Sequence, residues 1–418
     1  MLIQTILNKL EKFKSFVYKK VFLKKLFPTS SEVLVVEIAA RKNSRGACSA
    51  CGKSCPTYDR QPIRYYEYVP LWAIQVYFAY APRRVKCREH GIHVEQVPWA
   101  HGKQQMTKTY QLFLARWAKR LSWKEVAVVF QTSWESVYRS IEWVVNYGLD
   151  NADWSGITQI GVDEMAFFKG HNYLTCVYQL DKGRRRLLWC GKDRTAKTLL
   201  RFFRKLGKER SELLQFVCSD MWPAYLKVIK KKAVNALNIL DRFHIMKKFN
   251  EAIDEVRRDE VKELKSKEQE NVLANGRWLL LKKAQNLTEK QTVRLNKLLK
   301  INLSSIKAYL MREDFQQFWE MKFPFWGNKF LDDWATRAMQ SNLAPMKKLA
   351  KMLRRHKDLI LNWFSADGLS SGPVEGLNTK AKLAVRKAYG FKTLKCLQIA
   401  LYHQLGDLKE PPWTHRFC

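Results

Sequence analysis

The segment at 159–167 is apolar and rich in β-forming residues, yet Asp163 and Glu164 stand at its centre. This pattern predicts a buried strand that carries Asp163. A carboxylate on a central strand loses hydration, so a cation, a proton or hydrogen bonds must compensate for the loss. Asp163 is therefore a candidate functional residue, and Glu164, on the opposite face of the strand, is its natural control.

Two further acids occupy comparable positions. The apolar segment 213–219 predicts a strand that ends at Asp220, and Glu375 falls in the first turn of a helix that opens near 372. Each acid alone is most simply a solvated residue at the end of an element. Together, Asp163, Asp220 and Glu375 instead predict a divalent-metal site, because hard cations prefer carboxylate oxygens.

The charge of the chain points to the class of its partner. Its 418 residues suffice for roughly two to four domains. Lys and Arg number 75 against 39 Asp and Glu, a net charge of +36, which predicts a polyanionic partner such as nucleic acid or an anionic membrane surface. No apolar run reaches the roughly 18 residues of a membrane span, and no secretory signal is recognised, so a cytoplasmic protein without a membrane partner is expected.

The first 28 residues mix lysines with apolar residues at roughly helical spacing. They predict a basic amphipathic helix over 1–30. Such a helix could lie on DNA or on a membrane, but packing against its own protein with a solvated lysine face is the favoured interpretation. A strand is expected over 31–40, with its apolar run at 33–38.

A zinc site is indicated by two pairs of residues with ligand spacing. Cys48 and Cys51 form a CxxC turn, and Cys87 and His90 follow two predicted strands. These four residues can close a tetrahedral Zn²⁺ site in a β module that spans 31–100.

The spacing leaves alternatives for this site. Cys55 competes with either cysteine of the CxxC turn, and His93 competes with His90. The residues could also be ordinary thiols of a small β module. The 9 cysteines are scattered, with one cluster at ligand spacing, which fits reduced thiols and one zinc site better than disulfides.

Two capping boxes, starting at Ser122 and Thr132, place helix starts ten residues apart. That spacing predicts a helix-turn-helix domain within 101–150. A plain helical hairpin has the same periodicity, but the zinc module and the net charge favour DNA binding. The residues of the second helix expected to face DNA are Ser133, Ser136 and Arg139.

The order of elements around the first two acids predicts a fold. Three strands, a helix, a strand, a helix and a strand are expected over 155–240, the order of a ribonuclease-H-like core. In that fold the first and fourth strands are neighbours, which would bring Asp163 and Asp220 together. An all-helical insertion is expected over 241–366, followed by the second part of the core with the Glu375 helix over 367–418.

The insertion is rich in aromatic residues, which favour a hydrophobic core over a base-stacking platform: Phe315, Phe318, Trp319, Phe325, Trp326, Trp334 and Trp363. In the last helix, one stripe carries a carboxylate, an amide and two cations, namely Glu375, Asn378, Lys382 and Arg386. The expected fold is thus a multidomain α+β protein with a zinc-binding β module, a helix-turn-helix and an α/β core interrupted by helices.

In their order and spacing, these motifs resemble those of a known family, the DDE transposases of bacterial insertion sequences, in the group called ISL-three. The resemblance spans about 33–405. The family has Ser-Asn-Gly before its Glu, and Ser371 replaces the Asn here. The segments that carry the resemblance are the CxxC and CxxH pairs, 97–100, 161–164, 169–171, 219–220, 241–244, 372–378 and 388–391.

The resemblance implies an enzyme that binds terminal inverted repeats and catalyses metal-dependent strand cleavage and strand transfer. Asp163, Asp220 and Glu375 would hold two Mg²⁺ or Mn²⁺ ions for phosphodiester hydrolysis and transesterification, and Asp241 and His244 are secondary candidates. The zinc and helix-turn-helix modules would recognise the repeats. Residues expected on the DNA beside the site are Lys169, His171, Asn378, Lys382 and Arg386.

The implied partner is double-stranded DNA, both the repeats and the target, at the bacterial nucleoid. A homodimer or higher oligomer is expected because two transposon ends must be joined. The alternative function is a catalytically decayed or recruited copy that acts as a sequence-specific DNA-binding protein. A third hypothesis is a metal-dependent ribonuclease or repair nuclease on the same core. The N-terminal zinc and helix-turn-helix modules and the helical insertion disfavour it. The presence of all three acids favours the transposase.

Overall fold

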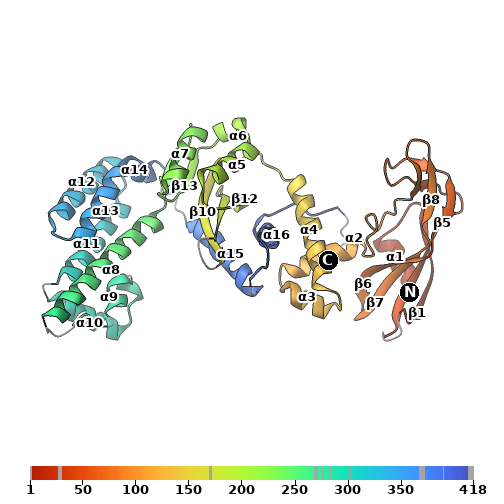
Figure 1. The fold of residues 1–418 in the computed structure, drawn as a ribbon, viewed down its shortest axis with the longest axis horizontal. Coiled ribbons are helices and arrows are strands. Elements are labelled where there is room, and N and C mark those ends of the chain that lie inside the picture. Colours follow the sequence, from red (N-terminus) through yellow and green to blue (C-terminus); the bar gives the residue numbers. More distant parts are fainter. Residues whose placement is uncertain are drawn as a thin grey trace. The chain divides into compact units, whose positions relative to one another are not determined.

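The computed structural model divides the chain into two compact units, Met1–Asp153 with Ala381–Cys418, and Trp154–Lys380 (Figure 1). Among the described helices, none has the length and apolar character needed to cross a membrane. The residues described are 2–26, 31–168, 172–267, 272–274, 276–282, 284–301, 303–366, 372–388 and 390–412.

The first unit begins with a short helix, α1 (Ile3–Leu10), and a four-stranded sheet. The aromatic core of this sheet surrounds Trp99, which is 1% exposed and contacts the rings of Phe16 and Tyr80. The sheet has the order β1 (Phe16–Lys24), β2 (Val33–Ala40), β7 (Ile74–Tyr80), β6 (Arg64–Leu71), with β2 and β7 parallel and the outer pairs antiparallel.

The predicted helix over 1–30 is wrong beyond its first third, since α1 ends at Leu10 and β1 occupies Phe16–Lys24. In β1 the side chains of Phe16 and Tyr18 alternate into the core. An aromatic and β-branched run favours a pleated strand. The mixture of lysines and apolar residues is compatible with the periodicity of a helix and with that of a strand. The favoured interpretation of packing within the protein holds for α1, whose Leu7 is buried.

The rest of the zinc-module region consists of short strands. β3 (Gly46–Ala47) pairs with β4 (Ser54–Cys55), and β8 (Arg83–Cys87) lies between β5 (Thr57–Arg60) and β9 (Gly91–Val94). The strand pairing brings Cys48 and Cys51, on one turn, towards the end of β8.

Three helices follow the β modules: α2 (Lys108–Ala118), α3 (Trp123–Val129) and α4 (Trp134–Asp150). The capping box at Ser122 is confirmed, because Ser122 and Glu125 each bond the other's backbone N–H. The box at Thr132 is wrong by one residue: Ser133 caps α4, since Gln131 has a positive φ of 52° and the turn continues through Thr132.

The C-terminal segment belongs to this first unit. Glu410 pairs with Arg116 of α2 at 2.8 Å, and α16 (Leu394–Leu405) packs against α4. Leu408 lies so close to Gly148 of α4 that a Cβ there would come within 2.6 Å of its side chain. The expectation that all of 367–418 joins the α/β core therefore differs from the structure after Lys380, because these contacts hold the segment on α2 and α4.

The second unit is built on a five-stranded sheet with the order β12-β11-β10-β13-β14. The predicted neighbours, the first and fourth strands, are confirmed: β10 and β13 are parallel, as are β13 and β14, whereas β10, β11 and β12 are antiparallel. The strands are β10 (Gln159–Phe168), β11 (Asn172–Gln179), β12 (Arg186–Lys192), β13 (Phe216–Ser219) and β14 (Leu237–Leu240).

One face of this sheet packs on helices that follow β12 and β13. Ile160 and Val162 of β10 share a buried cluster with Phe202 of α5 (Ala196–Leu206) and Tyr225 of α7 (Pro223–Lys232). The short helix α6 (Lys208–Glu212) follows α5. The alternation along β10 therefore turns Ile160 and Val162 towards α5 and α7, and Gly161 and Asp163 to the other face.

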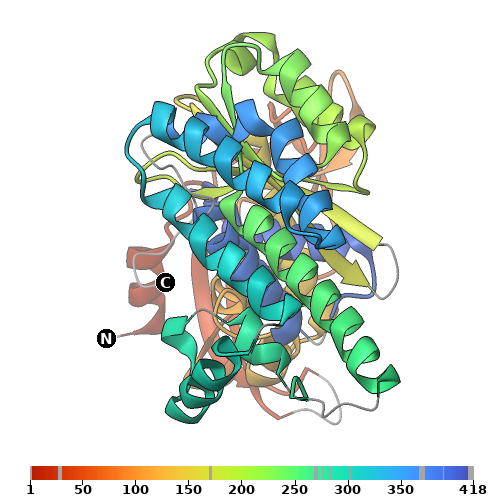
Figure 2. The same cartoon turned by 90° about the vertical axis from the view of Figure 1, so that its left-hand side faces the viewer.

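The region after β14 is helical where it is described, and Figure 2 shows α8 running beside α11 and α13. Asn362 of α14 donates to the carbonyl of Asn238 in β14 at 2.9 Å, which fixes the region to the sheet. Its helices are α8 (Arg242–Ser266), α9 (Arg277–Leu281), η1 (Ala284–Asn286), α10 (Glu289–Leu299), α11 (Ser304–Gln316), η2 (Gln317–Glu320), α12 (Pro324–Gln340), α13 (Ala344–Arg355) and α14 (Lys357–Ser365).

The aromatic residues of this region divide into two groups. Most of those predicted as core are buried or half-buried. The prediction is wrong for Phe325 and Trp326, which lie in the first turn of α12 and are 68% and 54% exposed. The core group comprises Phe315, Phe318, Trp319, Trp334 and, half-buried, Trp363.

Candidate functional site

Three aspartates follow one another across the parallel strands of the five-stranded sheet. Val162 pairs with Ser219, and Ser219 pairs with Leu240. The next residue along the chain is an aspartate in each case, so Asp163 within β10, Asp220 just after β13 and Asp241 just after β14 form one row.

Asp163 is largely removed from water on its central strand. Burial raises the pKa of its carboxyl, the nearby His244 opposes that rise, and the charges of Asp220 and Asp241 add to it. The backbone N–H of Glu164 donates to Asp163 Oδ1 at 2.7 Å, and the side-chain amide of Asn378 donates to Oδ2. These two hydrogen bonds fix the direction in which the carboxylate points.

The helix α15 (Gly372–Lys387) supplies Asn378 and holds it in place. Asn378 is 6% exposed, and its Oδ1 accepts the hydroxyl of Tyr178 from β11 at 2.6 Å. Val374, one turn earlier, packs on Gly161 so closely that a Cβ there would lie 2.4 Å from Val374 Cγ2. The first turns of α15 thus rest on β10 and β11 where only a glycine leaves enough room.

The predicted DNA contact of Asn378 is contradicted, because its amide is buried and bonded to Asp163 and Tyr178. Lys382 and Arg386 are exposed further along α15, beyond the boundary of the second unit. Lys169 and His171 lie outside the described residues.

Asp220 is 6% exposed and is held by its neighbours on both oxygens. The backbone N–H of Trp222 donates to Oδ1 at 3.0 Å, and the Arg194 guanidinium donates to Oδ2 at 2.5 Å. Arg194 also contacts Glu164 at 2.9 Å. Burial, reinforced by the charge of Asp220, raises the pKa of Glu164 to about 7.

These contacts change the expected role of Glu164. It lies on the opposite strand face from Asp163, as predicted, but Arg194 connects it to Asp220, so it is not an independent control. Sequence reasoning missed Arg194 because its local sequence does not distinguish it from the other basic residues of a chain with 75 Lys and Arg.

Asp241 and His244 complete the cluster. Asp241 caps α8 by accepting the N–H of Phe243 at 2.7 Å, and its second oxygen lies 2.9 Å from His244 Nδ1. Burial disfavours the charged imidazolium, yet Asp241, Asp163 and Asp220 outweigh it and raise the pKa of His244. The row of acids is therefore flanked by two basic side chains, His244 and Arg194.

Glu375 lies three residues before Asn378, on the same face of α15, and its side chain is exposed. Within the described ranges, Asp163, Asp220 and Glu375 do not form a group whose oxygens all lie within 4.8 Å. The donor chemistry of Asp163 and Asp220 suits a hard divalent cation. Sheet and helix thus bring two of the predicted acids together and place the third one turn from Asn378.

The predicted zinc residues Cys48, Cys51, Cys87 and His90 do come together, with their ligand atoms all within 4.8 Å. The Cys87 sulfur lies 3.6 Å from His90 Nδ1 and 3.8 Å from the Cys51 sulfur. Its hydrogen bond with His90 lowers the pKa of the Cys87 thiol to about 6, which favours the thiolate that binds zinc.

The two competing ligands stand outside this group. Cys55 is buried and its thiol faces the carbonyl of Lys53 at 3.4 Å. His93 stacks edge-on against His90, with ring centroids 6.3 Å apart. The geometry therefore favours three cysteines and one histidine as the set that could hold a metal.

The start of α4 presents the residues predicted to contact DNA. Ser133 accepts the N–H of Ser136 at 3.0 Å, and Arg139, 68% exposed, pairs with Glu135 at 2.6 Å. Ser136 and Arg139 border a hollow of about 510 Å³ whose other walls include polar residues of the loop before α2. That loop contributes Lys103, Gln104 and Gln105.

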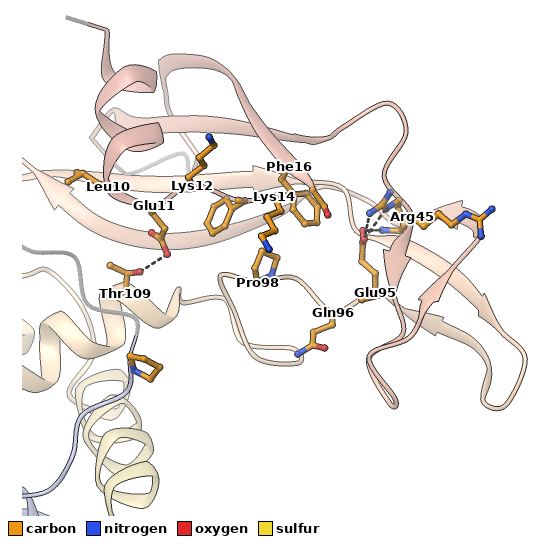
Figure 3. Close-up of a pocket in the computed structure, with 15 residues that line it drawn as sticks. Leu10, Glu11, Lys12, Lys14, Phe16, Arg45, Glu95, Gln96, Pro98 and Thr109 are labelled. Atoms are coloured by element: carbon orange, nitrogen blue, oxygen red, sulfur yellow. Dashed lines mark hydrogen bonds and ion pairs between the residues drawn. The ribbon is translucent and has the colours of Figure 1, made fainter. Parts of the chain in front are cut away.

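A second hollow of about 560 Å³ lies at the turn between α1 and β1 (Figure 3). Its two acids have internal partners, since Thr109 donates to Glu11 at 2.8 Å and Glu95 is buried in an ion pair with Arg83. The rim carries exposed cations, Lys12, Lys14 and Arg45. This hollow offers positive charge to a polyanion and no spare acid for catalysis.

Comparisons with known proteins agree with the motifs. A family model of the ISL3 group of DDE proteins, described as "Transposase", matches residues 160–401. The chain is 28% identical over 348 residues to the transposase for insertion sequence element IS1001 of Bordetella parapertussis, covering 82% of this chain and 85% of the relative. It is 26% identical over 417 residues to the transposase for insertion sequence element IS1557 of Mycobacterium tuberculosis, covering 90% and 91%.

The cysteine and histidine cluster predicts about one Zn²⁺ per purified chain by elemental analysis. Replacing Cys48 and Cys51 by Ser should remove the ion and unfold this module, because structural zinc supplies folding free energy. Cys55→Ser is the matched control and should keep its zinc. Metal-free protein with a cooperatively folded module would contradict the assignment.

The close contact between Gly161 and Val374 predicts that a substitution at Val374 can restore stability lost by a substitution at Gly161. Gly161→Ala should lower the free energy of unfolding by about 1–3 kcal/mol through overpacking, and adding Val374→Ala should recover part of that loss by making room. Denaturant unfolding of the two single variants and the double variant measures the coupling. Strictly additive losses would show that α15 does not rest on β10 at this point.

Proposed function

Because the chain belongs to the ISL-three family of DDE transposases, we propose that it binds the ends of an insertion sequence and cleaves and joins DNA strands at a metal site of Asp163, Asp220 and Glu375. The observation that carries this proposal is the row of aspartates across β10, β13 and β14, with α15 seated on β10 beside it.

We assign the five-stranded sheet to a ribonuclease-H-like core. Support comes from its order, with three antiparallel strands continued by two parallel strands, and from the helical region that separates β14 from α15. In this assignment Asp163 and Asp220 stand at neighbouring strands, and Glu375 arrives on a helix after the insertion. The helices α8–α14 are then the insertion.

The residues of the chain prepare the site for its metal. Two Mg²⁺ or Mn²⁺ ions would activate the attacking water or 3′-hydroxyl and stabilise the leaving oxygen. Asn378 and the Glu164 N–H aim the Asp163 carboxylate, and the Trp222 N–H aims that of Asp220. Glu375, exposed on the same helix face as Asn378, is the third ligand in this proposal.

DNA recognition is assigned to the first unit. The start of α4 would enter the major groove of the terminal repeat with Ser133, Ser136 and Arg139, as the second helix of a helix-turn-helix does. The exposed cations Lys12, Lys14 and Arg45 would bind phosphates, which adds affinity without reading sequence. Two copies of the chain would act together, since both ends of the element must be joined.

The metal-site proposal predicts the effect of three variants. Asp163→Asn, Asp220→Asn and Glu375→Gln should each abolish Mg²⁺-dependent cleavage of an end-containing DNA, while binding of that DNA stays within about twofold. Glu209→Gln, an exposed acid of the same unit, is the control and should keep full activity. Near-normal cleavage by one of the three variants would remove that residue from the site.

A wild-type chain that binds the repeat yet cleaves nothing would favour the alternative, a sequence-specific DNA-binding protein of the same origin.

If the start of α4 recognises the sequence of the terminal repeat, removing Arg139 should reduce the preference for the repeat over scrambled DNA. Arg139→Ala should weaken binding to the terminal repeat by roughly tenfold, as expected for one base contact, and leave scrambled DNA nearly unaffected. Lys14→Ala, which removes one of the exposed cations assigned to phosphates, should weaken binding to both DNAs equally. Fluorescence anisotropy at fixed salt, with the full chain because α16 packs on α4, measures both. Equal losses on both DNAs by Arg139→Ala would contradict the reader assignment.

A further inference from the structure

Arg194 lies between two acids beside the row of aspartates. Its Nη1 contacts Glu164 at 2.9 Å and its Nη2 contacts Asp220 at 2.5 Å. The guanidinium also stacks on the indole of Trp222, 4.4 Å from the ring centroid. Arg194 precedes Thr195, the residue that caps α5, so the helix start fixes its backbone.

The charge around this arginine explains why a cation is needed there. Glu164 and Asp220 share one guanidinium, Asp163 adjoins Glu164 in the chain, and all three acids are at least partly buried. Like charges withdrawn from water repel strongly unless a counter-ion is present. Arg194 provides one positive charge where such a counter-ion is required.

The contacts of Arg194 are separable. Different nitrogens bind Glu164 and Asp220, and the ring of Trp222 supports the guanidinium from a third direction. The contact with Asp220 can therefore be lost while those with Glu164 and Trp222 remain. Asp220 keeps the N–H of Trp222 on its other oxygen, so its carboxylate stays aimed when Arg194 leaves.

We propose that Arg194 is a positioning residue that neutralises Asp220 in the metal-free protein and yields Asp220 Oδ2 to the divalent metal when it binds. This inference rests on the proposed metal site at Asp163 and Asp220. It assigns Glu164 the role of the second anchor, which keeps the displaced guanidinium beside the site.

In this proposal Arg194 and the metal compete for Asp220 Oδ2. Removing Arg194 should therefore lower the stability of the metal-free protein and raise its affinity for Mg²⁺. In the presence of EDTA, Arg194→Gln should melt at a lower temperature than the wild type, because the acids lose their counter-ion. Its affinity for Mg²⁺ should rise by roughly tenfold, which corresponds to about 1.4 kcal/mol. The melting temperature should therefore gain more from Mg²⁺ in Arg194→Gln than in the wild type.

The experiment is a thermal-shift titration of the full chain with MgCl₂, without DNA. Arg194→Lys keeps a positive charge but cannot bridge both acids. Its Mg²⁺ affinity should therefore lie between those of the wild type and Arg194→Gln. This variant replaces Arg194→Gln in the test if Arg194→Gln fails to fold. Lys192→Gln, an exposed cation at the end of β12, is the matched control and should leave the affinity unchanged.

The outcomes separate this inference from the proposed function. If the wild type gives no Mg²⁺ response, or Asp163→Asn leaves that response unchanged, the metal site is wrong and the inference falls with it. If the wild type responds and Asp163→Asn abolishes the response, but removing Arg194 leaves Mg²⁺ affinity equal or weaker, only the inference is overturned. An equal gain in Mg²⁺ affinity in Lys192→Gln and Arg194→Gln would also overturn the inference, because the effect would then come from the lower net positive charge alone.

Discussion

The withdrawal of the Asp163 carboxylate from water is the constraint on which the second unit depends. Its central strand leaves it only partly exposed, and the loss of water raises its pKa. The surrounding elements compensate: α15 brings the Asn378 amide, β10 turns a backbone N–H towards it, and α8 brings His244. Both helices also have a second task, since α15 carries Glu375 and α8 is capped by Asp241. The packing that satisfies one buried acid therefore positions the others.

Local sequence was sufficient for the features that depend on local chemistry. One β-forming run carries Asp163 and another ends at Asp220. The order of elements around them, typical of a ribonuclease-H-like core, predicted neighbouring strands, and β10 pairs with β13. The spacing of Cys48 and Cys51 with Cys87 and His90 predicted a cluster whose ligand atoms lie within 4.8 Å. In both cases the chemistry excludes most alternatives, because a buried acid or a thiolate group tolerates few surroundings.

Features that depend on tertiary contacts were not predictable in the same way. Asn378 shares a helical stripe with Lys382 and Arg386, yet it is buried because Gly161 lets α15 approach β10. The segment after Lys380 belongs with α2 and α4 through Glu410 and α16, contacts that no local pattern reveals. Nothing in the local sequence indicated that Arg194 lies beside the row of aspartates. In residues 16–24 the lysines fit a helix and a strand equally well, and the core around Trp99 decided for the strand.

The central claim is that Asp163, Asp220 and Glu375 hold the metal that cleaves DNA. Its most direct test is a crystal structure of the chain bound to an end-containing DNA in Mn²⁺, with the ions located by anomalous scattering. The account predicts Mn²⁺ within about 2.5 Å of carboxylate oxygens of all three acids, with Arg194 withdrawn from Asp220. Mn²⁺ bound instead by Asp241 and His244, with Glu375 still in solvent, would contradict it.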